Sequence, residues 1–192
     1  IALTFLGILT LTYAESPPRI NECLNLEGKQ NFDPHKYFKG NWYLTHIHNA
    51  APTGVCRDTK LELLEDGSVL KKTYGYKEDG GETVFHQINC NGTLKSDLAK
   101  VKFLCQYVEH SQDKEFGMDG TVLETDYDNF SVYYICAKEK EHFGENFLVA
   151  SRNKLEVPTD SRIAETLKKH GYFLDKFVSR KNVDCKDHPD FK

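Results

Sequence analysis

The middle of the chain alternates between apolar and polar residues, a pattern typical of strands that bury one face. In Leu98–Tyr107, for example, Val101 and Phe103 alternate with charged neighbours, and Glu65–Ser68 is a turn signature. The pattern predicts eight strands, over Trp42–His48, Arg57–Leu64, Val69–Tyr76, Thr83–Cys90, Leu98–Tyr107, Phe116–Thr125, Phe130–Cys136 and Asn146–Arg152. Short turns between strands, with no helical stretch, favour an all-β fold: a closed up-and-down antiparallel barrel, which can hold one small ligand.

The tail has a helical pattern instead. Asp160 is a candidate N-cap, Ile163 and Leu167 lie one helical turn apart, and Gly171 is a stop signal. We expect this C-terminal α-helix to pack on the outside of the barrel. The Lys- and Asp-rich last residues are expected to form a frayed end.

The first fourteen residues, Ile1–Ala14, are apolar and uncharged, with Thr12 and Ala14 at the positions that precede a cleavage. They predict a secretory signal peptide with a truncated start, the alternative being a buried N-terminal helix. Residues 15–192 then form a single domain. The net charge of −4 speaks against a nucleic-acid binder.

Six cysteines in a secreted chain indicate three disulfides. Cys90 and Cys105 flank a turn-like segment, so they are expected to face each other across a hairpin. The number of cysteines alone does not decide how the other four pair. No cluster of cysteines and histidines has the spacing of a zinc site. Two sequons, at Asn91 and Asn129, predict glycosylation in turns.

Three motifs resemble the lipocalin signatures, in order and at similar spacing. Gly40 and Trp42 stand at the start of the first strand, Thr125-Asp126-Tyr127 precede the seventh, and Arg152 ends the eighth. The resemblance implies that Arg152 covers Trp42. Four segments carry a closer resemblance: Asn31–Tyr43, Val55–Arg57, Tyr127–Phe130 and Val183–Cys185. They resemble the salivary lipocalins of blood-feeding triatomine bugs, in particular the triabin and pallidipin group, with the nitrophorins as more distant relatives.

The resemblance also implies two disulfides, Cys23–Cys136 and Cys56–Cys185. The third pair, Cys90–Cys105, agrees with the hairpin argument.

Strand alternation predicts which side chains face the cavity. If Trp42 points inward, so do Leu44, His46 and His48. In Thr83–Cys90 either of the two alternating sets of side chains could face inward, and we choose the set that contains His86. A slip of one residue would invert any strand's set. The expected ligand-binding residues are Leu44, His46, Thr73, Gly75, Val84, His86, Phe103, Tyr107, Tyr133, Ile135, Leu148 and Ala150.

The nitrophorins carry a haem-ligating histidine between two tyrosines, and here the corresponding trio is Tyr74-Gly75-Tyr76. Glycine cannot bind iron, so haem and nitric-oxide carriage are not favoured, although His46 or His86 could in principle be a ligand. Gly75 and Thr73 are expected to leave room in the pocket. No cofactor or metal is expected.

The favoured hypothesis is a secreted monomer in saliva that sequesters a small host mediator, a thromboxane or eicosanoid-type lipid, and so impairs platelet aggregation and haemostasis. The alternative is a triabin-like inhibitor of a clotting or contact-phase protease that docks through acidic stretches such as Glu62–Asp66 or Lys77–Glu82. Biogenic amines and ADP are less favoured ligands. Catalysis is not expected, because paired cysteines leave no pocket thiol and no catalytic motif is present.

Overall fold

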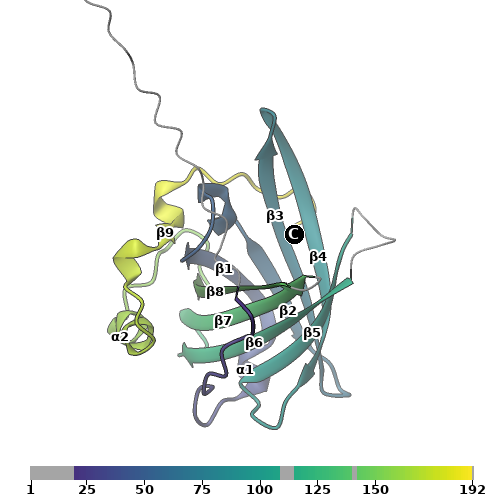
Figure 1. The fold of residues 1–192 in the computed structure, drawn as a ribbon, viewed down its shortest axis with the longest axis vertical. Helices are drawn as coiled ribbons and strands as arrows, with labels where there is room; N and C mark the ends of the chain where they lie inside the picture. Colours follow the sequence, from purple (N-terminus) through teal and green to yellow (C-terminus); the bar gives the residue numbers. More distant parts are fainter. Residues whose placement is uncertain (1–19, 109–114, 140–141, 192) are drawn as a thin grey trace, which may run out of the picture.

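The computed structural model describes residues 20–108, 115–139 and 142–191 (Figure 1). Eight antiparallel strands follow one another around the sheet, and β1 pairs with both β8 and β2, which closes the barrel. The strands are β1 (Lys39–Ile47), β2 (Asp58–Leu63), β3 (Ser68–Asp79), β4 (Glu82–Leu94), β5 (Lys100–Tyr107), β6 (Glu115–Thr125), β7 (Phe130–Glu139) and β8 (His142–Ser151).

The predicted eight-stranded barrel is confirmed, and the structure adds short elements that the pattern did not show. A ninth strand, β9 (Val178–Ser179), pairs antiparallel with the last two residues of β1. A single-turn helix, α1 (Pro34–Tyr37), precedes β1, and its N-cap Asp33 accepts two backbone hydrogen bonds. Short 3-10 helices cover Pro52–Val55, Leu174–Lys176 and Arg180–Asn182.

The tail helix α2 (Ser161–Lys169) packs outside the barrel, as predicted (Figure 1). The Asp160 carboxylate caps it by accepting a hydrogen bond from the backbone of Arg162. Ile163 and Leu167 are buried in one cluster with Phe130 and other outward-facing side chains of the wall. None of the helices in the described ranges is long and apolar enough to cross a membrane.

All three expected disulfides are present: Cys23–Cys136, Cys56–Cys185 and Cys90–Cys105. The first ties the N-terminal segment to β7, and the second ties the tail to the segment just before β2. The third joins β4 to β5, where Cys90 and Cys105 are register partners, as the hairpin argument required.

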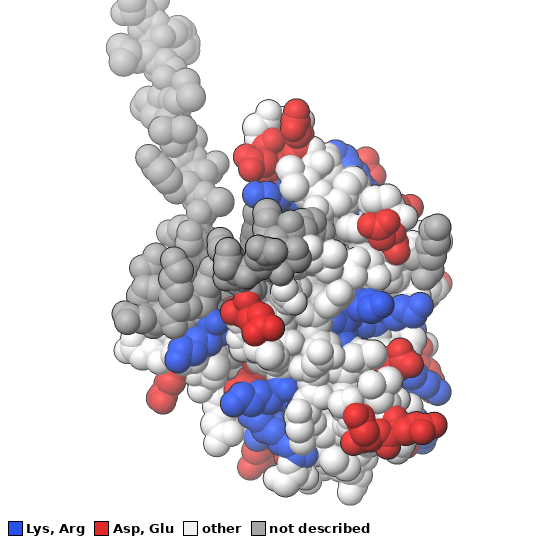
Figure 2. Space-filling view, turned by 90° about the vertical axis from the view of Figure 1, so that its right-hand side faces the viewer, with Lys and Arg blue, Asp and Glu red and all other residues white. Residues whose placement is uncertain are grey.

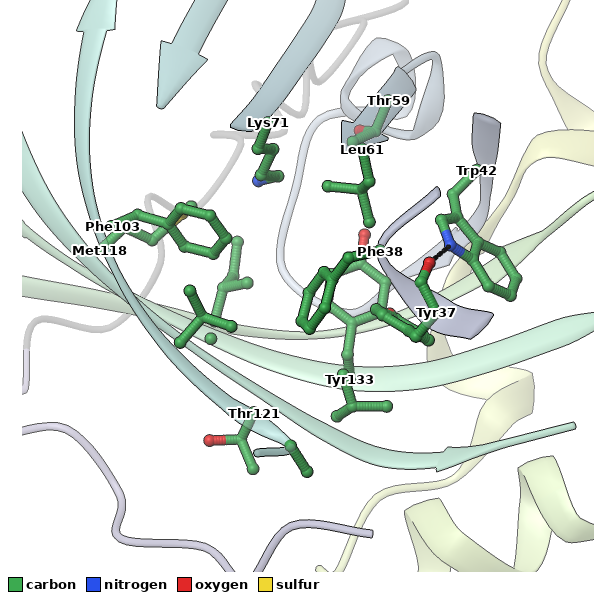
Figure 3. A pocket seen from close by; sticks show the side chains of 15 residues that line it. Tyr37, Phe38, Trp42, Thr59, Leu61, Lys71, Phe103, Met118, Thr121 and Tyr133 are labelled. Carbon is green, nitrogen blue, oxygen red and sulfur yellow. Dashed lines mark hydrogen bonds between the residues drawn. The ribbon is translucent and has the colours of Figure 1, made fainter. Parts of the chain in front are cut away.

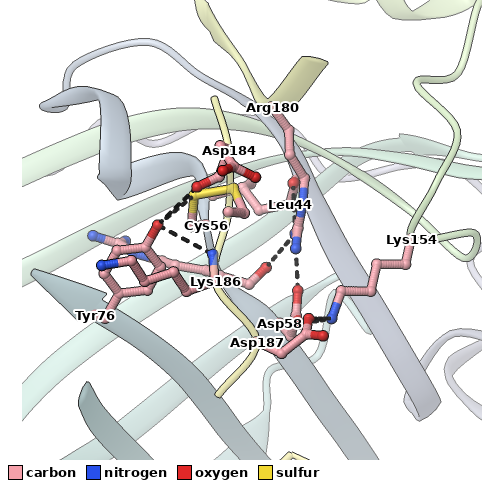
Figure 4. Close-up of a disulfide and its surroundings, with 11 residues drawn as sticks. Leu44, Cys56, Asp58, Tyr76, Lys154, Arg180, Asp184, Lys186 and Asp187 are labelled. Carbon is pink, nitrogen blue, oxygen red and sulfur yellow. Dashed lines mark hydrogen bonds and ion pairs between the residues drawn. A yellow bond between two sulfur atoms is a disulfide. The ribbon is translucent and has the colours of Figure 1, made fainter. Parts of the chain in front are cut away.

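The last residues are not a frayed end, so that expectation is wrong. Beside the Cys56–Cys185 bridge, the backbone N–H of Lys186 donates to the Tyr76 hydroxyl (Figure 4). His188 is buried and packs on Tyr74 at 5.1 Å between ring centroids, and Phe191 packs on the same ring at 5.2 Å. The tail is thus an ordered strap over the outer face of β3.

The two sequons differ in setting. Asn129 lies in the β6–β7 turn, as expected, and its side-chain amide donates to Asp126. Asn91 lies within β4 on the outer face of the wall, so its placement in a turn is wrong. Glycosylation of either residue stays a prediction, as does the signal peptide, because Ile1–Ala14 lies outside the described residues.

Candidate ligand-binding site

One end of the barrel is closed by the residues of the lipocalin-like motifs. Trp42 is only 3% exposed, and its indole N–H donates to the carbonyl of Tyr37. The Arg152 guanidinium lies 3.7 Å from the centre of the Trp42 ring, as the resemblance implied. It also donates five hydrogen bonds, at 2.6–3.2 Å, to the carbonyls of Lys36, Tyr37, Lys39, Asn41 and Tyr127.

The second motif forms the turn beside this seal. The Asp126 carboxylate accepts backbone hydrogen bonds from Asn129 and Phe130, while the Thr125 hydroxyl donates to the carbonyl of Phe130. Tyr127 has a positive φ of 72°, which points its carbonyl at Arg152. The motif residues are therefore structural: they hold the closed end.

Above the seal, the barrel encloses a small apolar cavity of about 50 Å³ (Figure 3). Phe103, Tyr133 and Ile135 of the expected ligand-binding set line it, and so does Trp42. The full lining is Tyr37, Phe38, Trp42, Thr59, Leu61, Lys71, Ala99, Val101, Phe103, Met118, Gly120, Thr121, Val122, Tyr133 and Ile135.

A lysine that the sequence analysis did not select projects into this cavity. Lys71 comes from β3, and its ammonium lies 5.7 Å from the centre of the Phe103 ring (Figure 3). Burial, together with the positive charge of Arg57, lowers the pKa of Lys71 to about 8. Its position could have been found from the sequence, because Lys71 has the same parity as Thr73 and Gly75, which were expected inside.

Arg57 is a second interior cation that was missed. Its Cγ lies 3.4 Å from where a Cβ on Gly75 would stand, so its stem crosses the interior face of β3. Its positive charge acts on two interior tyrosines, Tyr107 and Tyr133, and burial lowers the pKa of Arg57 itself. Cys56 points outward to its disulfide partner, so alternation along the chain places the next residue, Arg57, inside. This alternation was the signal in the sequence that could have revealed Arg57.

Neither interior cation has an acidic partner among the described residues. Every ion pair that this part of the chain forms involves other cations, most of them at loops and on the outer wall. Arg180, for example, donates to Asp58 at 2.8 Å beneath the strap (Figure 4). Arg57 and Lys71 are half-buried, and a cation that is partly removed from water without a counter-charge is costly, so these two residues are the strongest sign of a binding site.

His86 and Gly75 face each other across β3 and β4. The expectation that Gly75 leaves room in the pocket is wrong: a Cβ there would stand only 3.0 Å from Nε2 of His86, so the imidazole fills that space. His86 is also edge-on to Tyr107, at 6.2 Å between centroids. The residues present do not fit a haem, because no side chain at 75 can bind iron and the cavity is far below the roughly 300–1,000 Å³ of pockets for drug-sized ligands.

The expectation that His46 and His48 point inward is wrong, because a bulge in β1 changes the parity. The register with β8 shifts between Leu44 and His46, so His46 lies opposite Val149, whose side chain packs in the outer cluster. His48 packs on the tail residue Tyr172, at 4.7 Å between centroids. Burial lowers the pKa of His46 to about 4.

The other expected residues take varied places. Leu44 and Leu148 share one buried cluster against which Tyr133 and Ile135 also pack, and Ala150 belongs to the cluster around Trp42. Thr73 is buried, and its hydroxyl lies 3.2 Å from that of Thr59. Val84 is 40% exposed near the β3–β4 hairpin tip and does not reach the cavity.

Known proteins resemble this chain in sequence and in structure. Triplatin of Triatoma infestans is 30% identical, over 97% of this chain and 96% of its own length, and pallidipin of Meccus pallidipennis is 29% identical, over 96% of each. Among solved structures, the tryptamine complex of the amine binding protein of Rhodnius prolixus has a TM-score of 0.70 at 17% identity, covering 85% of this chain and 89% of that one.

A second solved structure, a mutant of LTBP1 in complex with leukotriene C4, has a TM-score of 0.59 at 20% identity, covering 83% of this chain and 92% of that one. The model of the Nitrophorin family matches residues 23–192. The chain therefore belongs to the Nitrophorin family and is similar, along nearly its whole length, to the salivary lipocalins of triatomine bugs.

Proposed function

We propose that this protein is secreted in saliva and sequesters a small amphipathic anion, a carboxylate-bearing lipid of the eicosanoid type, and so impairs platelet aggregation. The observation that carries the proposal is the pair Arg57 and Lys71, two interior cations beside an apolar cavity with no acidic partner among the described residues. A lipid carboxylate would supply the missing counter-charge, and its hydrocarbon chain would contact the apolar lining.

The same charges argue against an amine as the ligand. A protonated amine would bring a third positive charge next to Arg57 and Lys71, and like charges repel more strongly in a poorly hydrated interior. An anion reverses the sign of that interaction. Arg57 is the better partner for a carboxylate, because its guanidinium can donate two parallel hydrogen bonds.

The cavity must widen to admit such a lipid. Its volume of about 50 Å³ is well below that of a pocket enclosing a drug-sized ligand, roughly 300–1,000 Å³. Met118 and Phe103 lie on the lining, and the thioether side chain of methionine adapts easily to a new shape. We expect the lipid chain to displace these side chains while the carboxylate stays near Arg57.

The comparisons support this class of function. One relative, platelet inhibitor triplatin-2 of Triatoma infestans, is 28% identical over 96% of this chain and 98% of its own length. The structural neighbour LTBP1 binds leukotriene C4. Family and fold are those of lipocalin ligand carriers. Acidic and basic side chains intermingle on the middle of the face over β4 and β5, so this part of the surface offers no acidic patch for a basic protease exosite (Figure 2).

Calorimetric titration tests the proposal with a stable thromboxane analogue in two forms, the free acid and its methyl ester. The acid should bind at least about tenfold more tightly than the ester, a difference of about 1.4 kcal/mol. Arg57→Gln should remove this preference. Lys72→Gln, a neighbour of Lys71 on the exposed outer face of β3, is the matched control and should keep it.

Three outcomes would contradict the proposal. Equal binding of acid and ester would show that the interior cations do not recognise the carboxylate. Heat with tryptamine but with neither lipid would favour an amine carrier instead. Prolonged clotting without any lipid effect would favour the protease inhibitor.

A further inference from the structure

The amine of Lys71 has the surroundings of a nucleophile, and the reversible sequestration proposed above does not use that property. We propose that Lys71 captures lipids bearing an α,β-unsaturated carbonyl group covalently, by conjugate addition. This activity goes beyond the proposed function, because it requires neither a carboxylate on the lipid nor Arg57.

The geometry places the amine where a lipid would lie. Lys71 projects from β3 into the cavity, towards a lining that is otherwise almost entirely apolar (Figure 3). Leu61, its register partner on β2, and Phe103 on β5 flank it. An apolar chain that fills this cavity therefore passes within reach of the nitrogen.

The surroundings also favour the reactive, uncharged amine. Burial among apolar side chains disfavours the positive charge of Lys71, Arg57 repels it to a lesser extent, and no carboxylate in the described ranges pairs with it. Since the pKa of Lys71 is lowered to about 8, roughly a tenth of the amine is neutral at pH 7, far more than for an ordinary lysine. Desolvated lysines of this kind are the ones that act as nucleophiles in proteins.

The reaction balances without a co-reactant. The nitrogen lone pair attacks the β carbon, a carbon–nitrogen bond forms, and the electrons of the carbon–carbon double bond move toward the carbonyl. A proton then passes from the nitrogen to the α carbon. Nothing leaves and nothing is oxidised, so the protein gains the whole mass of the lipid.

Intact-protein mass spectrometry tests the proposal with 1-octen-3-one, an uncharged enone with a short apolar tail, at equimolar concentration. We expect one adduct per protein, and peptide mapping should locate it at Lys71. Lys71→Arg keeps the positive charge and removes the nucleophile, so it should slow single-adduct formation at least tenfold. Lys72→Arg is the matched control and should react like the parent protein.

The variants separate this proposal from the proposed function. Arg57→Gln should lose the preference for a lipid acid over its ester and still form the adduct. Adducts spread evenly over surface lysines in the parent protein, or an unchanged rate in folded Lys71→Arg, would overturn covalent capture. The peptide map of the parent protein decides the question even if a variant fails to fold.

Discussion

The closed end of the barrel and its middle each hold half-buried positive charge, but the cations have different surroundings. Arg152 donates to five carbonyls and covers the face of Trp42. Arg57 and Lys71, in the middle, have no acidic partner among the described residues. A cation whose donors are all used inside the protein is structural, whereas one left without a counter-charge is available to a ligand.

This difference has a consequence for stability. The contacts of Arg152 should stabilise the folded state, since removing it would leave the carbonyls that accept its hydrogen bonds without their donors. Lys71 should do the reverse, because its desolvation is not offset. The predictions below test that contrast, beginning with the largest effect.

The first prediction concerns Arg152→Ala. The substitution leaves several carbonyls without donors and uncovers Trp42, so we expect the free energy of unfolding to fall by about 3–4 kcal/mol. Urea denaturation measures it. Arg152→Lys keeps the charge but loses the planar fork, and it should recover less than half of that loss. An unchanged midpoint in Arg152→Ala would show that the closed end does not depend on this residue.

The second prediction concerns Lys71→Met, which should raise the free energy of unfolding of the unliganded protein. The folded-state pKa of Lys71 lies below its usual value, so below pH 8 folding must bury a charge that the unfolded chain keeps hydrated. Removing it should stabilise the protein by about 1–3 kcal/mol at pH 7. The gain should shrink as the pH rises from about 8 to above 10. Destabilisation of a well-folded variant at pH 7 would contradict the contrast.

The third prediction concerns His46, a buried group that stays neutral at pH 7. Its pKa is about 4 in the folded protein, against 6.5 as the ordinary value, so the unfolded chain binds a proton first as the pH falls. Stability should be almost unaffected by His46 above pH 6.5 and should decrease between pH 6.5 and 4, by about 2 kcal/mol at pH 5.

Thermal unfolding at pH 7 and pH 5 measures this effect. His46→Leu should flatten the decrease, whereas His35→Gln, at an exposed position before the barrel, should not. An identical pH dependence in parent protein and His46→Leu would rule His46 out as its cause.

Alternation along the sequence predicted the barrel well because each strand in it buries one face. It also placed Phe103, Tyr133 and Ile135 on the cavity wall. The same rule failed in β1, where one extra residue at the bulge turned His46 outward. A bulge leaves the hydrophobic pattern almost unchanged, so nothing in the sequence revealed it.

The interior cations were missed for a different reason. Lysine and arginine in a strand ordinarily face solvent, and that expectation outweighed the parity that Lys71 shares with Thr73. The ordered tail was missed because its contacts depend on a long-range disulfide. Charged residues near Cys185 have no periodicity that would show where the chain packs.

The two long disulfides cross one another along the chain, since Cys23 pairs with Cys136 and Cys56 with Cys185. Any single backbone cut between residues 23 and 185 therefore leaves both fragments joined by at least one bridge. A protease that nicks an exposed loop in this range cannot separate the pieces unless a reductant is also present. In an oxidising, protease-rich fluid, the barrel would stay one molecule after its first cleavage.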